Sequence, residues 1–411
     1  MSGCGCDGSD LHPVDEVIEH LLTRAPCPPK TEQVALADAL GRVLGEDLHA
    51  PNDVPAWDNS AMDGYALRAS DLPGNGGVLP LGGRIAAGNA AQTPLAPGQA
   101  VRIFTGAPLP PGADTVVAQE DCRVDAAGVW LPPVKLGAHV RKKGEELGRG
   151  SLLLSAGQRL RPQEIGLLAS MGFAQVPVYR PLRVGLLSSG DELREPGETL
   201  QPGQIYNANR FTLGAVLRSL GLEVHDYEVM ADDLAVSRDA LSLAASEWDM
   251  LLTSGGVSVG EEDHLKQAIR ELGELHLWRL AIQPGKPLAF GEVGGKPWLG
   301  LPGNPAAALI TALIVARPFL LRAQGRVEVQ PKALALPAAF NWTQPRSRRQ
   351  YLRARLQADD QGQLQVHLHP RQGSAMLSSA CWSDGLAVIE IGQTLQAGEA
   401  VSYLSFAELL Q

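Results

Sequence analysis

Three glycine-containing turns hold most of the polar side chains that could do chemistry. They are SSGDE at 188–192, SGGVSVGEED at 254–263 and LPGNP at 301–305, and each follows an apolar run that predicts a buried strand. Backbone N–H groups of such turns can bind an anion. Acidic residues fall at or just after strand ends: Asp191, Glu192, Asp232, Asp233, Glu261, Glu262 and Asp263. Carboxylates gathered at one cleft favour Mg²⁺ shared with a substrate phosphate, although the helix dipole alone favours some of them.

The second turn also contains GVSVG, which matches the GxSxG elbow that presents the serine of a hydrolase, here Ser258. In an elbow the serine follows its strand at once, whereas this apolar run ends at Leu252 or Thr253. No HGGG-type segment is present, and Asp360 and His367 follow only in an order that chance also produces. The pattern therefore favours an anion cradle over a nucleophile.

Other motifs are less specific. Lys286 in QPGKP is either a cation for a phosphate or other oxyanion, or a solvated loop lysine. No Walker A sequence occurs, and the histidines show no zinc-ligand spacing. Cys4 and Cys6 lie in a Gly/Ser tail, either as a metal site or as a flexible end, and the scattered odd set of 5 cysteines indicates reduced thiols.

The elements expected around these turns alternate between strand and helix over 181–325, which predicts a mostly parallel, doubly wound α/β sheet. Ligands bind beyond the carboxyl ends of such strands, so the three turns should converge. The apolar helix at 306–316 is shorter than the ~18 residues of a membrane span and is expected in the core. Residues 31–44 are expected to form a helix.

Composition divides the 411 residues into four predicted parts. They are a helical linker at 11–48 and 146–180, a β-rich part at 49–145, an α/β domain at 181–328 and a small C-terminal β-barrel or sandwich at 329–411. A net charge of −10 argues against nucleic acid and anionic membranes as partners. The start of the chain has no signal-peptide pattern, so a cytoplasmic location is expected.

Several motifs, in order along the chain, resemble the molybdopterin molybdenumtransferases, the MoeA family that includes the E domain of gephyrin. They are DNSAMDGYA (58–66), FTGAPLPPGADTVV (104–117), LSSGDEL (187–193), LTSGGVSVGEEDH (252–264), PGKPLAFG (284–291) and GLPGNPAAA (300–308). The resemblance implies a homodimer of four-subdomain protomers with an active site shared between protomers. It implies insertion of molybdate into adenylylated molybdopterin, with Mg²⁺ as cofactor and AMP as product.

The same resemblance assigns roles to residues. Catalytic roles fall on Asp63, Thr105, Glu192, Asp232, Asp263 and Lys286. Metal binding falls on Glu192, Asp232 and Asp263. Binding of the substrate falls on Ser189, Gly190, Ser254, Gly255, Gly256, Ser258, Pro302, Gly303, Asn304 and Pro305. Asp63 and Thr105 would reach the cleft from the partner protomer.

The chain departs from many relatives at three positions: Gln283 stands where a lysine is common, Arg279 replaces another lysine, and Glu146 replaces an aspartate. Loss of a cation at Gln283 bears on oxyanion affinity. Two alternatives remain open, a molybdopterin adenylyltransferase and a non-catalytic binding scaffold. The expected protein partners are a molybdopterin adenylyltransferase and maturation proteins of molybdoenzymes.

Overall fold

The computed structural model describes residues 11–88, 93–256 and 264–411. The chain divides into two compact units. The larger unit comprises Met1–Gly45, Gly157–Pro162 and Gln175–Gln411, and the smaller unit comprises Glu46–Ala156 and Gln163–Ala174. The finer, four-part division expected from composition stays a prediction.

A six-stranded sheet forms the centre of the larger unit. Its order is β17 (Glu223–Met230), β14 (Arg183–Ser189), β18 (Met250–Ser254), β22 (Lys296–Leu301), β21 (Pro287–Val293) and β19 (Gly273–Arg279). The first four strands are parallel, and β21 and β19 continue the sheet in antiparallel pairs. The predicted mostly parallel sheet is thus confirmed.

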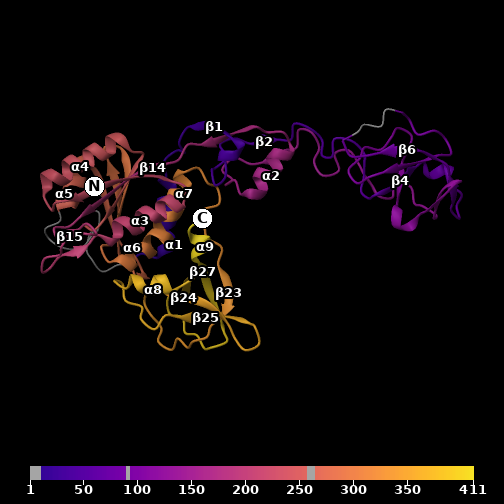
Figure 1. The fold of residues 1–411 in the computed structure, drawn as a ribbon. Helices are drawn as coiled ribbons and strands as arrows, with labels where there is room; N and C mark the ends of the chain where they lie inside the picture. Colours follow the sequence, from indigo (N-terminus) through magenta and orange to yellow (C-terminus); the bar gives the residue numbers. More distant parts are fainter. Residues whose placement is uncertain (1–10, 89–92, 257–263) are drawn as a thin grey trace. The chain divides into compact units, whose positions relative to one another are not determined.

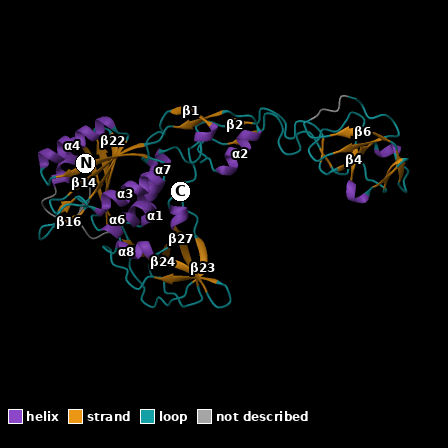
Figure 2. Ribbon diagram, viewed as in Figure 1, coloured by secondary structure: helices purple, strands orange, loops and turns teal. Residues whose placement is uncertain are grey.

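Helices cover both faces of this sheet (Figure 1, Figure 2). On one face α1 (Val14–Thr23), α3 (Ala208–Ser219), α6 (Pro305–Thr311) and α7 (Arg317–Ala323) pack into one apolar core. On the other face α4 (Leu234–Glu247) and α5 (His264–Leu272) build a second core. Asn207 and Asp233 cap the starts of α3 and α4 by accepting hydrogen bonds from backbone N–H groups of the first turn. Local capping therefore fixes where the helices leave the strand ends.

The apolar helix after β22 is longer than predicted. It runs from α6 through a π-helical turn, η4 (Ala312–Ala316), into α7. This 19-residue stretch has the length and composition of a membrane span, but 89% of its apolar 18-residue window is buried in the protein. Pro318 lacks an N–H, and the wider π turn before it lets the helix continue. Arg317 is buried, and its guanidinium donates to the carbonyl oxygens of Val329 (2.9 Å) and Glu408 (3.1 Å). The expected end at 316 is wrong, while the core location is confirmed.

The C-terminal strands form another sheet of the larger unit. The order is β20 (Ile282–Gln283), β24 (Arg349–Ala358), β26 (Gly385–Ile389), β27 (Ala400–Ser405) and β23 (Leu334–Pro337), and β25 (Leu364–Leu368) pairs with β24. A bridge between Ala338 and Val366 brings the two sides of the sheet together around a core that includes Leu352 and Tyr403. The helices α8 (Leu377–Trp382) and α9 (Phe406–Leu409) follow β25 and β27. The closed barrel stays a prediction.

Residues 31–44 do not form the expected helix. Thr31–Ala35 is a strand, β1, which pairs with β13 (Gln175–Tyr179), and a 3₁₀ turn, η1 (Leu36–Asp38), follows it. Val34 lies opposite Val176, and Leu44 forms a bridge with Val178. Pairing with a segment distant in the sequence supplies the burial that a helical stripe would have supplied, so tertiary contacts override local propensity.

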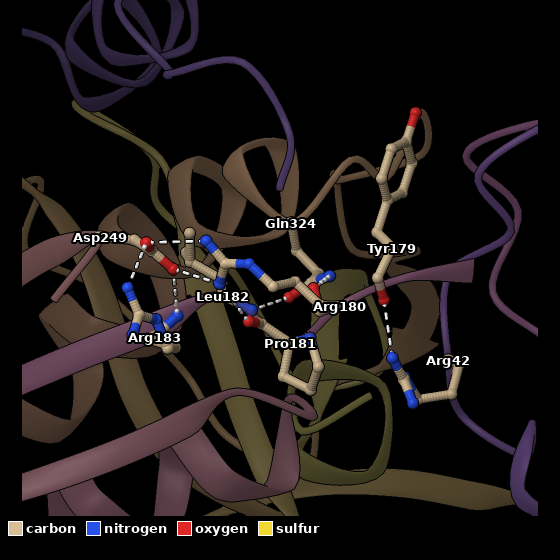
Figure 3. A network of polar contacts seen from close by, with 8 residues as sticks. All are labelled: Arg42, Tyr179, Arg180, Pro181, Leu182, Arg183, Asp249 and Gln324. Atoms are coloured by element: carbon tan, nitrogen blue, oxygen red, sulfur yellow. Dashed lines mark hydrogen bonds and ion pairs between the residues drawn. The ribbon is translucent and has the colours of Figure 1, made fainter. Parts of the chain in front are cut away.

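A polar network joins β13 to the sheet of the larger unit (Figure 3). The carboxylate of Asp249 accepts two hydrogen bonds from Arg180, at 2.6 and 2.9 Å, and two from Arg183, at 2.9 Å from the backbone N and 3.2 Å from Nη2. The arginines hold the pKa of Asp249 far below its ordinary value, against the opposing effect of burial. Gln324 links the same segment, since it accepts from Leu182 N (2.5 Å) and donates to Arg180 O (3.0 Å).

The smaller unit is rich in short strands, as its short apolar runs predict, and two of its sheets have more than two strands. The first has the order β6 (Leu81–Ile85), β7 (Ala100–Ile103), β4 (Gly64–Leu67) and β8 (Thr115–Ala118), and the second β5 (Gly77–Leu79), β10 (Gly128–Leu131) and β9 (Arg123–Asp125). Tyr65, Val117 and Val129 belong to an apolar core shared by both sheets. The remaining short elements are β2 (Leu48–His49), β3 (Asn59–Ser60), η2 (Ala69–Asp71), η3 (Gln119–Asp121), β11 (Val140–Arg141), β12 (Leu152–Leu154) and α2 (Pro162–Ser170).

Candidate functional site

A cleft of about 1010 Å³ opens in the larger unit where β14, β18 and β22 end. Its lining includes most of the predicted site residues: Ser189, Gly190, Glu192, Asp232, Ser254, Gly255, Gly256, Lys286, Pro302, Gly303, Asn304 and Pro305. The three turns therefore converge as parallel strands require.

Asn209 of α3 ties two of these turns together. Its side-chain amide donates to Ser254 Oγ and to Gly303 O, each at 2.7 Å, and the residue is 8% exposed. Gly255 N also donates to Leu301 O at 3.2 Å. The turn after β18 is thus held against the turn after β22 from two sides.

The first turn is held by its own carboxylate and by a short strand pair. Asp191 Oδ1 accepts a hydrogen bond from Asp232 N at 3.0 Å. β15 (Leu193–Arg194) pairs in parallel with β16 (Ile205–Tyr206), and Ile205 N donates to Glu192 O at 2.9 Å. Asp191 is accordingly a scaffolding acid, while Glu192 and Asp232 line the cleft with exposed side chains.

Two glycines of the cleft are required by close backbone approach. Gly255 has φ +90°, and a Cβ there would lie 2.8 Å from Ser189 O. Gly285 has φ +109°, and a Cβ there would lie 2.3 Å from Thr311 Oγ1 of α6. The turn that carries Lys286 is therefore packed directly against the apolar helix, and Leu280 N fixes it further by donating to Lys286 O at 2.7 Å.

The sequence did not reveal the wall that the C-terminal sheet contributes. Arg348 and residues 372–375 line the same cleft, and Arg348 Nη2 donates to Gln283 Oε1 at 3.1 Å. The buried Arg353 supports this wall, because its backbone N donates to Gln372 Oε1 (2.9 Å) and its Nη2 to Gly373 O (3.0 Å). Burial lowers the pKa of Arg353 to about 10. The polar QGS turn at 372–374 was the signal available in the sequence.

Asp63 and Thr105 lie together in the smaller unit. Asp63 Oδ1 accepts hydrogen bonds from Thr105 N and Thr105 Oγ1, both at 2.8 Å. These bonds, backbone first, hold the pKa of the Asp63 carboxyl below its ordinary value, and Arg102 adds to the effect. Asp63 and Thr105, which the resemblance assigns to the active site of the partner protomer, thus form one hydrogen-bonded pair.

Part of the predicted site lies outside the described residues, namely Ser258, Glu261, Glu262 and Asp263, as do Cys4 and Cys6. Across 11–88, 93–256 and 264–411, no group of three or more His, Cys, Asp or Glu residues is arranged to hold a metal. Glu192 and Asp232 nevertheless face one cleft. Two carboxylates suit Mg²⁺, which commonly takes one or two of them and completes its shell with water and substrate phosphates.

The larger unit has a mostly parallel sheet, helices on both faces and a polar cleft at the carboxyl ends of the strands. These features define a doubly wound α/β ligand-binding protein, and this chain combines them with further β-rich parts. Three family models match along it: the MoeA N-terminal region (domain I and II) over 12–172, a probable molybdopterin binding domain over 185–322, and the MoeA C-terminal region (domain IV) over 335–406. The chain belongs to the molybdopterin molybdenumtransferases, the MoeA family.

Curated relatives and solved structures agree with this membership. The molybdopterin molybdenumtransferase of Haemophilus influenzae is 39% identical over 97% of this chain and 99% of its own length. Molybdopterin molybdenumtransferase 2 of Mycobacterium tuberculosis is 40% identical over 80% of this chain and 83% of its own. The molybdopterin biosynthesis MoeA protein from Pyrococcus horikosii matches with a TM-score of 0.76 at 32% identity, covering 97% and 99% of the two chains. The chain is therefore a transferase of molybdenum cofactor biosynthesis.

Proposed function

We propose that the chain inserts molybdate into adenylylated molybdopterin and releases AMP and molybdenum cofactor in a Mg²⁺-dependent reaction. The observation that carries the proposal is the cleft in which Glu192, Asp232 and Lys286 meet three glycine turns. Carboxylates can hold the metal ion of a bound pyrophosphate, and a cation and the backbone N–H groups of glycine turns can bind its oxygens.

Each part of the cleft has a proposed role. The turns after β14, β18 and β22, with Ser189, Gly256 and Asn304 among their residues, hold the phosphate and pyrophosphate oxygens of the substrate. Lys286 and Arg348 supply positive charge for molybdate. The hydroxyl of Ser258 binds the ligand and is not a nucleophile.

Glu192 and Asp232 would hold Mg²⁺ together with Asp263. The ion, when bound, polarises the pyrophosphate oxygens and neutralises the charge that develops as the bond to AMP breaks. The hydrogen bond from Asp232 N to Asp191 Oδ1 keeps the strand end that carries Asp232 beside the turn that carries Glu192. The protein's contribution is thus the fixed spacing of the two acids.

The functional molecule is proposed to be a homodimer with an active site shared between protomers, in which Asp63 and Thr105 act on the partner's cleft. A cytoplasmic location, the four-part protomer with its C-terminal β-barrel, and handover from an adenylyltransferase to molybdoenzyme maturation proteins complete the proposal. The motifs DNSAMDGYA and FTGA support the shared site. They hold Asp63 and Thr105 as a hydrogen-bonded pair that belongs to neither apolar core of the smaller unit.

The test is anaerobic AMP release from adenylylated molybdopterin, with and without molybdate and Mg²⁺. We expect release only with both, and a loss of about 10²-fold or more in Glu192→Gln and Asp232→Asn, since each removes charge stabilisation from the transition state. Asp239→Asn, at an exposed residue of α4, is the matched control. ATP consumption without molybdate would indicate the adenylyltransferase instead, and ligand binding with no release in any condition would indicate the scaffold.

A further inference from the structure

Two arginines of the smaller unit converge on one aromatic ring. The guanidinium carbon of Arg84 lies 4.6 Å from the centre of the Phe104 ring, and that of Arg102 lies 4.8 Å from it. Arg102 also lies 5.1 Å from the centre of the Tyr65 ring. Arg84 and Arg102 are directly paired in the parallel strands β6 and β7, so both side chains leave the sheet on the same face.

Like charges opposite each other on neighbouring strands repel, so this pair needs a compensating group. Phe104 supplies part of it through cation–π contact. Among the residues that the structure describes, neither arginine forms a salt bridge. The charge of Arg102 lowers the pKa of the Asp63 carboxyl, but the hydrogen bonds to that carboxylate come from Thr105. The positive charge of the pair is therefore not cancelled by an ion pair among these residues.

Hydrogen-bonding capacity is available as well. Arg102 donates from Nη1 to Gly64 O at 3.3 Å and from Nη2 to Gln119 Oε1, which fixes its orientation but uses only part of its donors. Arg84 is exposed, and within the described ranges no hydrogen bond of its guanidinium is found. One arginine is thus pre-oriented, and no described residue occupies the donor fork of its neighbour.

The pair lies at the same end of the four-stranded sheet as Asp63 and Thr105. Asp63 precedes β4, Phe104 and Thr105 follow β7, and Gly64 pairs with Ile103 in the antiparallel register that brings these ends together. A cationic pair and a hydrogen-bonded carboxylate thus lie at the same end of this sheet. That end of the sheet suits a ligand with separate anionic and hydrogen-bond-donating groups.

We propose that Arg84 and Arg102, held on Phe104, bind a phosphate or diphosphate group of an organic ligand. Guanidinium forks match phosphate oxygens in geometry, and the aromatic backing lowers the cost of orienting them. This inference deepens the proposed function, on which it rests for the identity of the ligand. It adds that the smaller unit contributes charge, and not only Asp63 and Thr105, to recognition of the substrate.

The test uses the full chain with its 7 phenylalanines replaced by 4-fluorophenylalanine, observed by ¹⁹F NMR while inorganic pyrophosphate is added. Phe104→Leu assigns the Phe104 signal, and exposed Phe211 in α3 reports on the other unit. We expect a saturable shift of the Phe104 signal. In Arg84→Ala and Arg102→Ala the midpoint should rise about tenfold or more, the effect of losing one charge-assisted contact.

The matched control is Arg123→Ala, because Arg123 lies 5.9 Å from the ring centre of Trp130 in the other sheet of the same unit. It should leave the Phe104 midpoint unchanged. A Phe104 signal that does not move, or that moves equally in the Arg84→Ala and Arg102→Ala double variant, overturns the inference. The measurement involves no turnover, so a protein that binds pyrophosphate at Phe104 but releases no AMP would contradict the proposed function while supporting this inference.

Discussion

The side-chain amide of Asn209 donates to Ser254 Oγ at 2.7 Å and, with its second hydrogen, to Gly303 O at the same distance. Helix α3 therefore fixes the spacing between the turns after β18 and β22. Since those turns carry the backbone N–H groups that would hold the substrate's phosphates, this amide contributes to the width of the anion cradle, together with the bond from Gly255 N to Leu301 O.

Asn209→Ala should lower both stability and activity. It leaves Ser254 and Gly303 without their buried partner, which costs about 1 to 3 kcal/mol in the free energy of unfolding. The Michaelis constant for adenylylated molybdopterin should rise, because the turns lose their fixed spacing. Urea unfolding and AMP release measure the two effects.

The control for this variant is Asn341→Ala. Asn341 Oδ1 accepts a hydrogen bond from Ala397 N at 2.8 Å in the C-terminal sheet region, away from the cleft lining. It should reduce stability without changing the Michaelis constant. Equal effects of both variants on AMP release would mean that Asn209 acts only through global stability.

Thr105→Ala should raise the pKa of Asp63. Thr105 donates two hydrogen bonds to this carboxylate, and they favour its charged form, so the native pKa lies below the ordinary value of 3.8. Removing the hydroxyl leaves only the backbone donor, and the carboxylate then protonates at a higher pH. A ¹³C NMR titration of the Asp63 carboxyl measures the change independently of activity.

Thr105→Ser keeps the hydroxyl and should retain the low pKa of Asp63. In the activity profile, the acid limb of AMP release should move to higher pH in Thr105→Ala and stay in place in Thr105→Ser. An unchanged Asp63 titration in Thr105→Ala would show that the hydroxyl bond contributes nothing to the charged state.

The position of the cleft could be predicted from sequence because parallel strands bring their carboxyl ends to one edge. Ser189, Ser254 and Pro302 each follow an apolar run, so their convergence needs no knowledge of side-chain packing. The start of α6 at Pro305 is local in the same sense, because proline is favoured at the first position of a helix. Features that depend on residues close together in the sequence could therefore be predicted.

Features that depend on contacts between distant segments could not be predicted from the sequence. The apolar pattern around Val34 predicts a helix, because nothing local in the sequence indicates the distant partner strand β13. Arg348 carries no signal in the sequence, because only the packing of the C-terminal sheet brings it beside Gln283. Asn209 reads as an ordinary polar residue of a helix, and only the fold places its amide between two turns. Nonlocal packing decided each of these cases.

Asp249→Asn should destabilise the larger unit in a pH-dependent way. Its partly buried carboxylate accepts from Arg180 and Arg183, so loss of the charge should cost about 2 to 3 kcal/mol at pH 7. The native pKa is depressed, so this stabilisation is fully present above the ordinary value of 3.8 and declines as pH falls below it. Urea unfolding of both proteins between pH 7 and about pH 2.5 gives the difference at each pH.

The gap between Asp249→Asn and the unmodified chain should therefore narrow below about pH 4. Asp239→Asn is the control, because the side chain of Asp239 is 75% exposed and its Oδ1 lies 3.4 Å from Nη2 of Arg238. Such an exposed ion pair is expected to contribute at most about 0.5 kcal/mol to stability. A gap that stays constant down to the lowest pH would contradict the assignment of this stability to the ionised carboxylate.

Arg348→Ala should weaken molybdate binding more than any change at Gln283. Gln283 Oε1 accepts a hydrogen bond from Arg348, so the amide that replaces a lysine orients a cation and does not supply one. Removal of the guanidinium should raise the Michaelis constant for molybdate about tenfold with little change in kcat, whereas Gln283→Ala, which leaves Arg348 in place but less oriented, should raise it about threefold. Arg346→Ala, an exposed arginine two residues away, should have no effect. If Gln283→Ala instead equals or exceeds Arg348→Ala, the amide contacts the oxyanion itself, and the cation for molybdate is Lys286 alone.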